Sequence, residues 1–249
     1  GGATAARRAG PRPAPGGLWA MTLPVMIFAA GFGTRMGALT RDRPKPLIEV
    51  AGRALIDHTL DLVAAHAPPR IVVNLHYRAE QLDAHLAGRD VLLSHETPEI
   101  LDTGGGLRAA RPLLGEGPVL TMNSDAIWRG PNPLTHLAER WDGARMGALL
   151  LCLPPDRARG HAGAGDFTRE ADGRLARGPG LVYSGVQIID PACLAEIPET
   201  VFSLNRAWDA LAAQGRLFGA VYPGHWCDVG RPEGIALAED MLEARNVRE

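Results

Sequence analysis

The sequence has 249 residues, of which 46% are hydrophobic and 22% charged, enough to bury one sizeable core in one globular domain. Its net charge is -2, with 26 Lys and Arg against 28 Asp and Glu, which argues against the broad basic field of proteins that bind nucleic acid or an anionic membrane. The apolar runs fall short of the roughly 18 to 20 residues that a membrane span requires. An anionic ligand must therefore be held by a local cluster of groups.

Residues 1–20 differ in composition from the rest of the chain. They are rich in Gly, Ala, Pro and Arg and have no hydrophobic period, so we expect a disordered leader before a single domain over residues 21–249. A transit peptide is the alternative, because the segment carries three arginines and no acidic residue. The segment has neither serine nor an amphipathic pattern, which favours the disordered leader.

The three cysteines, Cys152, Cys193 and Cys227, lie far apart and show no CxxC or Cys/His metal spacing. Such a set predicts free thiols rather than a disulfide framework or a zinc site. Free thiols suit a reducing compartment, and the start of the chain lacks the apolar core of a secretory signal. We therefore expect a cytoplasmic protein.

After Met21, short β-rich runs alternate with longer stretches of helical period, an order typical of an α/β fold with a doubly wound, mostly parallel sheet. The order of elements becomes mixed in the second half of the chain. We expect strands at 25–31, 70–77, 91–96, 118–128, 144–154, 181–190 and 217–224. We expect helices at 54–66, 79–88, 104–114, 132–143, 204–215 and 231–245.

Polar residues end several of the expected strands. In open α/β sheets, ligands bind at the carboxyl ends of the strands, near the point where the strand order reverses. Residues far apart in the sequence thus become candidate neighbours: the turn at 31–36, Asn74, Asn123 with Asp125, and Asp228.

The turn after the first strand reads GFGTRMG. It lacks the dinucleotide pattern G-x-G-x-x-G, because Met36 stands where the third glycine would be, and it is not a Walker A loop. What remains is a flexible run of backbone N–H groups beside Arg35, which suits a closely approaching polyphosphate. A glycine turn that merely reverses the chain is the alternative.

Lys45 stands between Pro44 and Pro46. The two prolines restrict the backbone, so the ammonium is carried by a segment that needs little further ordering to meet a phosphate. A solvated surface lysine in a proline-rich loop is the alternative.

Two aspartates follow apolar stretches, Asp125 in TMNSDAIW and Asp228 in an aromatic, glycine-flanked turn, GHWCDVG. Two carboxylates together with waters and phosphate oxygens form a typical Mg²⁺ shell. Each carboxylate taken singly is also explained as the cap of a turn. Beside a phosphate loop and a lysine, the pair indicates metal-assisted phosphoryl transfer. His225 and Cys227, close to Asp228, are interpreted as packing residues rather than as a ligand or a nucleophile.

Three consecutive glycines, residues 104–106, stand at an expected helix start. Glycine costs a helix about 1 kcal/mol per residue relative to alanine, which favours a need for close approach, such as a flat ring against the backbone. A tight strand-to-helix turn is the alternative.

The stretch IFAAGFGTRMGALTRDRPKPLIEVAGRALI resembles the G-x-G-T-R and K-P opening of sugar-phosphate nucleotidyltransferases. LDTGGGLRAA, MNSDAIW, GDFTRE, YSGVQII and GHWCDVG follow in the order of that family, so the resemblance covers about residues 23–240. Within the family, the sequence is most similar to the short type that uridylylates N-acetylmuramate 1-phosphate. The resemblance implies a Rossmann-like nucleotide-diphospho-sugar transferase fold, Mg²⁺ as cofactor, and the reaction of an NTP with a sugar 1-phosphate to give an NDP-sugar and pyrophosphate.

The resemblance also assigns roles by position. The nucleotide would be bound by Ala30, Gly31, Gly33, Thr34, Arg35, Lys45, Asn74 and Gly105. The sugar phosphate would be bound by Asn123, Asp166 and Gly185, and the metal by Asp125 and Asp228. Arg35 and Lys45 would be the catalytic residues, with Arg35 drawing charge from the departing pyrophosphate.

Some positions depart from the family pattern. The chain has GAGDFTREADGRL where many hexose-phosphate members carry Val-Glu-Lys-Pro, which favours the short uridylyltransferase type. Ser124 replaces an expected glycine, and no glutamine precedes the glycines to read the base.

Three alternatives stay open: another NTP, another acceptor such as a hexose 1-phosphate or phosphocholine, and a non-catalytic sugar-nucleotide-binding relative. We expect a monomer or small homo-oligomer. A dehydrogenase is disfavoured, because no acidic residue ends the strand at 70–77.

Overall fold

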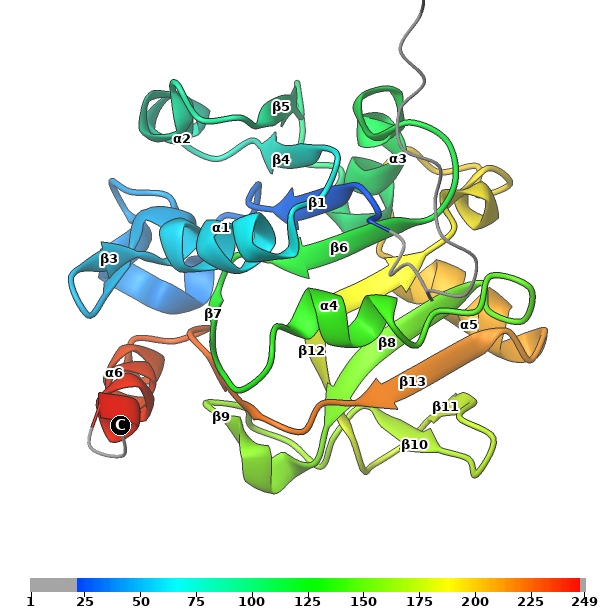
Figure 1. The fold of residues 1–249 in the computed structure, drawn as a ribbon. Helices are drawn as coiled ribbons and strands as arrows, with labels where there is room; N and C mark the ends of the chain where they lie inside the picture. The colour runs from blue at the N-terminus through cyan, green and yellow to red at the C-terminus, as the bar shows by residue number, and fades with distance from the viewer. Residues whose placement is uncertain (1–21, 247–249) are drawn as a thin grey trace, which may run out of the picture.

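The computed structural model describes residues 22–246, and the predicted leader over 1–20 lies outside them. Its centre is a seven-stranded sheet in the order β13-β8-β12-β6-β1-β4-β5, with helices on both faces (Figure 1). The strands of this sheet are β1 (Val25–Phe28), β4 (Ile71–Leu75), β5 (Leu92–His95), β6 (Val119–Asn123), β8 (Ala148–Leu153), β12 (Val182–Ile189) and β13 (Leu217–Val221). The helices are α1 (Leu55–His66), α2 (Ala79–Leu86), α3 (Asp102–Leu114), α4 (Pro133–Ala138), α5 (Asn205–Ala213) and α6 (Glu233–Asn246).

The sheet is mixed but mostly parallel. β12 runs antiparallel to both of its neighbours, β6 and β8, whereas the other neighbouring pairs are parallel. The predicted doubly wound, Rossmann-like sheet is therefore confirmed. Parallel strands β1, β4 and β6 end at the same edge, which is where a ligand is expected to bind.

The sheet separates two apolar cores. Along β1, Val25 and Ile27 point into the core beneath α1 and α4, and Met26 points into the core beneath α3 and α5, as the two-residue period of a strand requires. β8 is buried along its whole length, which explains its unbroken apolar sequence. A third cluster, which contains Met36, joins the segment after β1 to α6.

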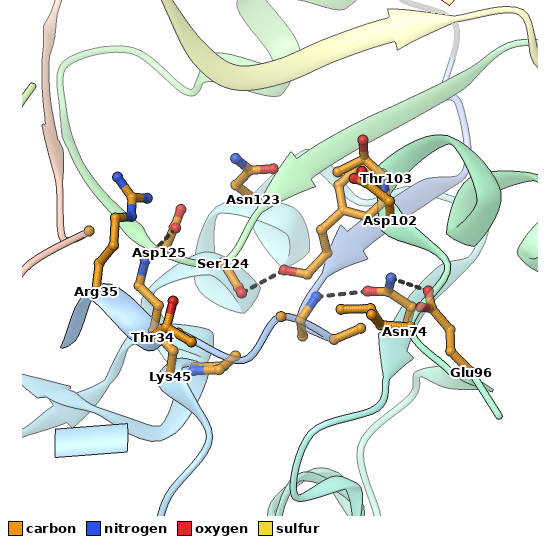
Figure 2. Close-up of a pocket in the computed structure, with 18 residues that line it drawn as sticks. Thr34, Arg35, Lys45, Asn74, Glu96, Asp102, Thr103, Asn123, Ser124 and Asp125 are labelled. Atoms are coloured by element: carbon orange, nitrogen blue, oxygen red, sulfur yellow. Dashed lines mark hydrogen bonds and ion pairs between the residues drawn. The ribbon is translucent and has the colours of Figure 1, made fainter. Parts of the chain in front are cut away.

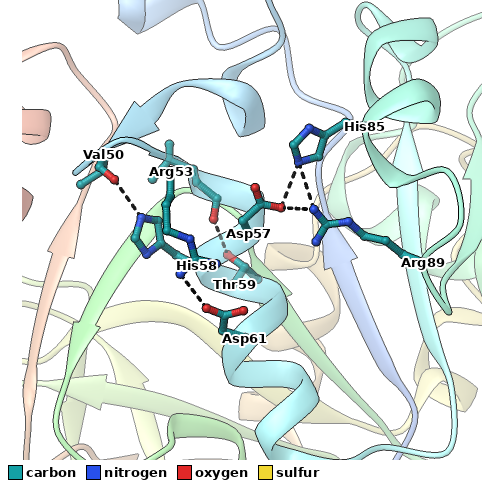
Figure 3. A network of polar contacts seen from close by, with 9 residues as sticks. Val50, Arg53, Asp57, His58, Thr59, Asp61, His85 and Arg89 are labelled. Atoms are coloured by element: carbon teal, nitrogen blue, oxygen red, sulfur yellow. Dashed lines mark hydrogen bonds and ion pairs between the residues drawn. The ribbon is translucent and has the colours of Figure 1, made fainter.

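Polar contacts fix the helices of the first half against one another (Figure 3). On α1, Asp57 accepts a hydrogen bond from His85 Nε2 at 2.9 Å and forms an ion pair with Arg89 at 2.7 Å, which ties α1 to the end of α2. His58 Nε2 lies 2.9 Å from the carbonyl of Val50 and holds the start of α1 against the preceding hairpin. This hairpin consists of β2 (Glu49–Val50) and β3 (Arg53–Ala54).

The region 118–128, predicted as one strand, is two strands in different sheets. β6 ends at Asn123, and β7 (Ala126–Arg129) joins a small sheet with β14 (His225–Asp228) and β9 (Ala158–Arg159). The chain turns between them, and Ser124 Oγ fixes the turn by donating a hydrogen bond to the carbonyl of Phe28 at 2.7 Å. Asp228 is the last residue of β14, so it ends a strand, whereas the glycines around it predict a turn.

Two further expectations need correction. The helix predicted at 132–143 ends at Ala138, and Asn132 caps its start by accepting hydrogen bonds from the N–H groups of Leu134 and Thr135. Residues 160–180, between the strands expected at 144–154 and 181–190, contain the hairpin of β10 (Phe167–Arg169) and β11 (Leu175–Arg177). Strands of two or three residues are too short to show a two-residue period, so such hairpins cannot be predicted from the hydrophobic pattern.

Candidate active site

Two adjoining cavities open at the carboxyl ends of β1, β4 and β6. The first, of about 310 Å³, runs between the loop after β1 and the start of α3. The second, of about 380 Å³, extends toward β12 and α5. Both are lined by Phe28, Arg35, Asp102, Thr103, Asn123 and Asp125, so they form one continuous depression.

Most of the predicted site residues line these cavities, and Figure 2 shows several around the first. Ala30, Gly31, Gly33, Thr34, Lys45 and Asn74 line the first cavity. Asp166, Gly185 and Asp228 line the second. Gly105 lines neither cavity.

The loop after β1 is held in a fixed conformation. Gly33 has φ of 64°, and a Cβ at this position would lie 2.9 Å from Cβ of Lys45, so glycine is required for both reasons. The carbonyl of Gly33 accepts hydrogen bonds from Met36 N–H and Thr40 Oγ1, each at 2.9 Å. Met36 is fully buried in the third cluster. The residue that breaks the dinucleotide pattern thus anchors the loop to the protein.

Lys45 is not a solvated surface lysine. Its residue exposure is 9%, and its Nζ lies 2.6 Å from Oδ2 of Asp125, at the base of the first cavity. It begins a short 3-10 helix, η2 (Lys45–Leu47), with Pro44 before it and Pro46 within it. The flanking prolines and the close packing against Gly33 leave the ammonium little freedom of position.

Asp125 and Asp228 are brought together by the small sheet. Asp228 pairs with Ala126 across β14 and β7, and the N–H of Val229 donates to the carbonyl of Asp125 at 2.9 Å. Burial, and then the charge of Asp125, raises the pKa of Asp228, while Lys45 and Arg35 oppose this rise. The two carboxylates therefore crowd negative charge into one partly buried place.

This crowding fits a divalent cation. Within residues 22–246, no group of three or more His, Cys, Asp and Glu side chains is arranged to hold a metal. Two carboxylates suffice for Mg²⁺-type coordination when substrate phosphates and waters supply the remaining oxygens. The residues present thus fit a metal that binds together with a phosphorylated substrate.

The wall of the second cavity is built around a glycine in β12. Gly185 has φ of 84°, and a Cβ there would lie 2.7 Å from Nδ2 of Asn123, so the glycine makes room for that amide. Asp166 Oδ2 accepts a hydrogen bond from the N–H of Tyr183 at 2.8 Å. Asn123, Asp166 and Gly185, predicted as one group, therefore lie on one wall.

The family follows from comparison with known proteins. Residues 25–216 match the model of the MobA-like NTP transferase domain. The chain belongs to this family. An N-acetylmuramate alpha-1-phosphate uridylyltransferase of Caulobacter vibrioides is 42% identical over 231 residues, covering 87% of this chain and 96% of the relative. The catalytic subunit beta of mannose-1-phosphate guanylyltransferase from Dictyostelium discoideum is 28% identical, covering 88% and 66%.

Solved structures confirm the fold. HddC from Yersinia pseudotuberculosis, complexed with GMP-PN, superposes with a TM-score of 0.73 at 21% identity, covering 88% of this chain and 99% of that one. A putative glucose-1-phosphate thymidylyltransferase from Bacillus anthracis gives 0.73 at 16% identity, covering 88% and 96%. The family match and the Caulobacter relative confirm the prediction of a nucleotidyltransferase, and the solved structures confirm its fold. Members of the MobA-like NTP transferase family generally use a divalent metal.

In this MobA-like transferase, Asn74 holds the start of the glycine loop that follows β1. Asn74 is 3% exposed, its Oδ1 accepts from the N–H of Ala29 at 2.7 Å, and its Nδ2 donates to Oε1 of Glu96 at 2.7 Å (Figure 2). The second oxygen of Glu96 accepts from the N–H of Leu101 at 2.7 Å. This Asn74–Glu96 clamp joins the ends of β1, β4 and β5 to the start of α3.

Asn74→Ala is expected to lower the free energy of unfolding by about 1 to 3 kcal/mol, because Ala29 N–H and a Glu96 oxygen lose their partner. The loosened loop is also expected to raise KM for the NTP more than it lowers kcat. Urea denaturation and steady-state kinetics measure the two effects. Gln81→Ala, which removes an exposed amide contact to Asp42, is the matched control and leaves both values unchanged. An unchanged KM in Asn74→Ala would contradict the clamp.

The predicted approach of Gly105 to a base is not what the structure shows. The N–H groups of Gly104 and Gly105 donate to the carbonyl of Phe202, and a Cβ on Gly105 would collide with the carbonyl of Thr200. A Cβ on Gly106 would collide with Glu96. The three glycines let the chain itself pack against the first turn of α3.

Several residues that line the two cavities were not predicted from the sequence. They are Glu96, Asp102, Thr103, His161, Arg177, Ser203 and Asn205. Glu96 follows β5 directly, so the strand-end rule that selected Asn74 would also have selected it. Arg177 and Asn205 reach the site through the β10–β11 hairpin and α5, and nothing in their local sequence marks them.

The cysteines and His225 are not placed to take part in the reaction. The three cysteines are free thiols as predicted, and burial raises the pKa of the Cys227 thiol to about 11, which disfavours a nucleophilic role. His225 faces Arg129 across the small sheet and lines neither cavity. None of the helices within 22–246 has the length and apolarity to cross a membrane.

Proposed function

We propose that this chain transfers a uridylyl group from UTP to N-acetylmuramate 1-phosphate, releasing pyrophosphate, with Mg²⁺ as the metal. The proposal rests on the Caulobacter relative, which carries that name and aligns with nearly its whole length. This activity is consistent with a cytoplasmic location. The cytoplasmic location and the monomeric or small homo-oligomeric state both stay predictions.

The observation that carries the proposal is the meeting of Arg35, Lys45, Asp125 and Asp228 where the two cavities join. The first cavity has the backbone of the glycine loop along one side and suits the triphosphate. The second suits the acceptor sugar phosphate. Arg35 and Asp125 line both cavities, so the α-phosphate belongs at this junction.

The chemistry needs no protein nucleophile. An oxygen of the acceptor phosphate is already anionic and attacks the α-phosphorus, while the bond to the pyrophosphate oxygen breaks. The protein has to align the two groups and reduce the repulsion between them. Lys45 is placed for the α-phosphate region and Arg35 for the departing pyrophosphate. Asp125 and Asp228 would hold the metal, which supplies further positive charge to the phosphate oxygens when bound.

The other predicted residues have supporting roles in this proposal. Ala30, Gly31, Gly33 and Thr34 present backbone to the triphosphate, and Asn74 holds their loop in place. Asn123, Asp166 and Gly185 form the wall that meets the acceptor.

A guanylyl transfer to a hexose 1-phosphate is the second candidate. Relatives named mannose-1-phosphate guanylyltransferase match at 27 to 28% identity, but with less coverage of their own length than the uridylyltransferase. A non-catalytic relative is disfavoured, because all four charged residues at the junction are present.

The test is a matrix of UTP, CTP, GTP, ATP and dTTP against N-acetylmuramate, N-acetylglucosamine, glucose and mannose 1-phosphates and phosphocholine. Pyrophosphate release and mass spectrometry of the product report turnover. We expect the highest kcat/KM for UTP with N-acetylmuramate 1-phosphate. No turnover with any UTP pair would contradict the proposal, and UTP binding without pyrophosphate release would favour the non-catalytic alternative.

A further inference from the structure

Arg177 lies in the wall of the second cavity, at the end of β11. Its guanidinium stacks over the ring of Phe167 at 4.8 Å and lies 5.6 Å from the ring centre of Trp208. Its Nε donates to Asp209 at 2.9 Å and its Nη2 donates to Oδ1 of Asn205 at 2.7 Å. The side chain is 43% exposed, so it is held in place without being withdrawn from solvent.

One nitrogen of this guanidinium, Nη1, is available to bind a ligand. Within the described residues 22–246, Nη1 donates to no protein group, although Nε and Nη2 both do. Nη1 therefore offers N–H donors from a position that stacking and two hydrogen bonds have already fixed. A pre-ordered arginine of this kind binds an anion at low entropic cost.

The neighbouring polar groups are ordered as well. Asn205 Nδ2 donates to Oγ of Ser203 at 2.9 Å while its Oδ1 accepts from Arg177. Asp209, the partner of Arg177, is an exposed carboxylate, and an ion pair at such an exposed position is weak. Asp166 is the other acid on this part of the wall, and the N–H of Tyr183 already occupies one of its oxygens.

Arg177 stands apart from the phosphate chemistry. It contacts residues of β10 and α5, whereas Lys45, Asp125 and Asp228 are joined through η2 and the small sheet. An acceptor whose phosphate lies at the junction would extend its sugar ring along the wall of Gly185 and Asp166. A substituent at the far side of the ring would then meet Arg177.

We propose that Arg177 is a specificity-determining residue that binds a carboxylate on the acceptor sugar, so that the second cavity selects sugar 1-phosphates with a second anionic group. This proposal rests on the proposed function. N-acetylmuramate carries such a carboxylate on its lactyl ether, and N-acetylglucosamine is the same sugar without it. The pair therefore isolates the contribution of the carboxylate.

The test measures kcat/KM of Arg177→Met for N-acetylmuramate 1-phosphate and for N-acetylglucosamine 1-phosphate. Methionine keeps an apolar stem over the rings and removes the charge. We expect a loss of about 10- to 100-fold with the muramate, mostly in KM, the size typical of a hydrogen bond to a charged group. We expect less than about a 2-fold change with the glucosamine. Arg177→Lys keeps the charge and is expected to restore part of the discrimination.

Arg174→Met is the matched control. Arg174 lies in the same hairpin region, pairs with Asp172 and Glu170, and lines neither cavity. It is expected to leave both acceptors unchanged. Equal losses on both acceptors in Arg177→Met, or no loss on either, would overturn the assignment of Arg177. If the unmodified protein turns over neither acceptor, the proposed function itself fails and this inference fails with it.

Discussion

Asp228→Asn is expected to lower kcat by about 1,000-fold or more, since clamps that hold a metal on a transferring phosphate contribute several kcal/mol to the rate. Asp228 and Asp125 are held side by side by the register of β14 and β7, and in the proposed site loss of one carboxylate would leave the cation with half of its protein charge. The loss is measured as pyrophosphate release over a wide Mg²⁺ range. Removal of divalent cations with EDTA is expected to abolish the activity of the unmodified protein, and readdition to restore it.

The same substitution separates function from stability. Burial and the charge of Asp125 raise the pKa of Asp228, so its ionised form is unfavourable in the metal-free protein. The amide removes that penalty, and the metal-free variant is expected to resist urea as well as or better than the unmodified protein. Asp61→Asn, which breaks an exposed ion pair with Arg53, is the control and keeps full activity. A folded Asp228→Asn protein that keeps a tenth of its activity would contradict the metal role.

Local patterns in the sequence predicted the central sheet and several residues that line the candidate site, and the family resemblance added others, such as Asp166 and Gly185. The apolar runs have strand length, and their polar ends, such as Asn74 and Asn123, must meet at one edge of a parallel sheet. The pairing of β7 with β14 was not predictable in this way. It depends on a turn at Ser124 that looks like the continuation of a strand, and it decides that Asp125 and Asp228 are neighbours.

The glycines at 104–106 show the limit of reasoning from one residue type. Glycine indicates that something approaches closely, but not what approaches. Here the partners are Phe202, Thr200 and Glu96 of the protein itself. These partners come from distant parts of the chain, and only the tertiary structure identifies them.

The amino-acid composition of the sequence singles out one residue of the candidate site in a way that the motifs do not. Lys45 is the only lysine in the sequence, so arginine supplies every other basic side chain. An ammonium is compact and forms a point contact, whereas a guanidinium is a broad planar fork. The stem of Lys45 packs against Gly33, and its ammonium makes such a point contact with Oδ2 of Asp125 at 2.6 Å.

Lys45→Met is expected to lower kcat/KM by about 100- to 1,000-fold, because in the proposed site the α-phosphate would lose a buried positive charge. Lys45→Arg is expected to recover little, since a broad planar fork does not reproduce the point contact that the ammonium makes 2.6 Å from Asp125. Arg43→Met, two residues away and exposed, is the control and keeps its activity.

As the only lysine, Lys45 is also the single side-chain amine that pyridoxal phosphate and borohydride can label. UTP with Mg²⁺ is expected to protect it, as peptide mapping would report. Labelling that proceeds equally with and without UTP would place the triphosphate elsewhere.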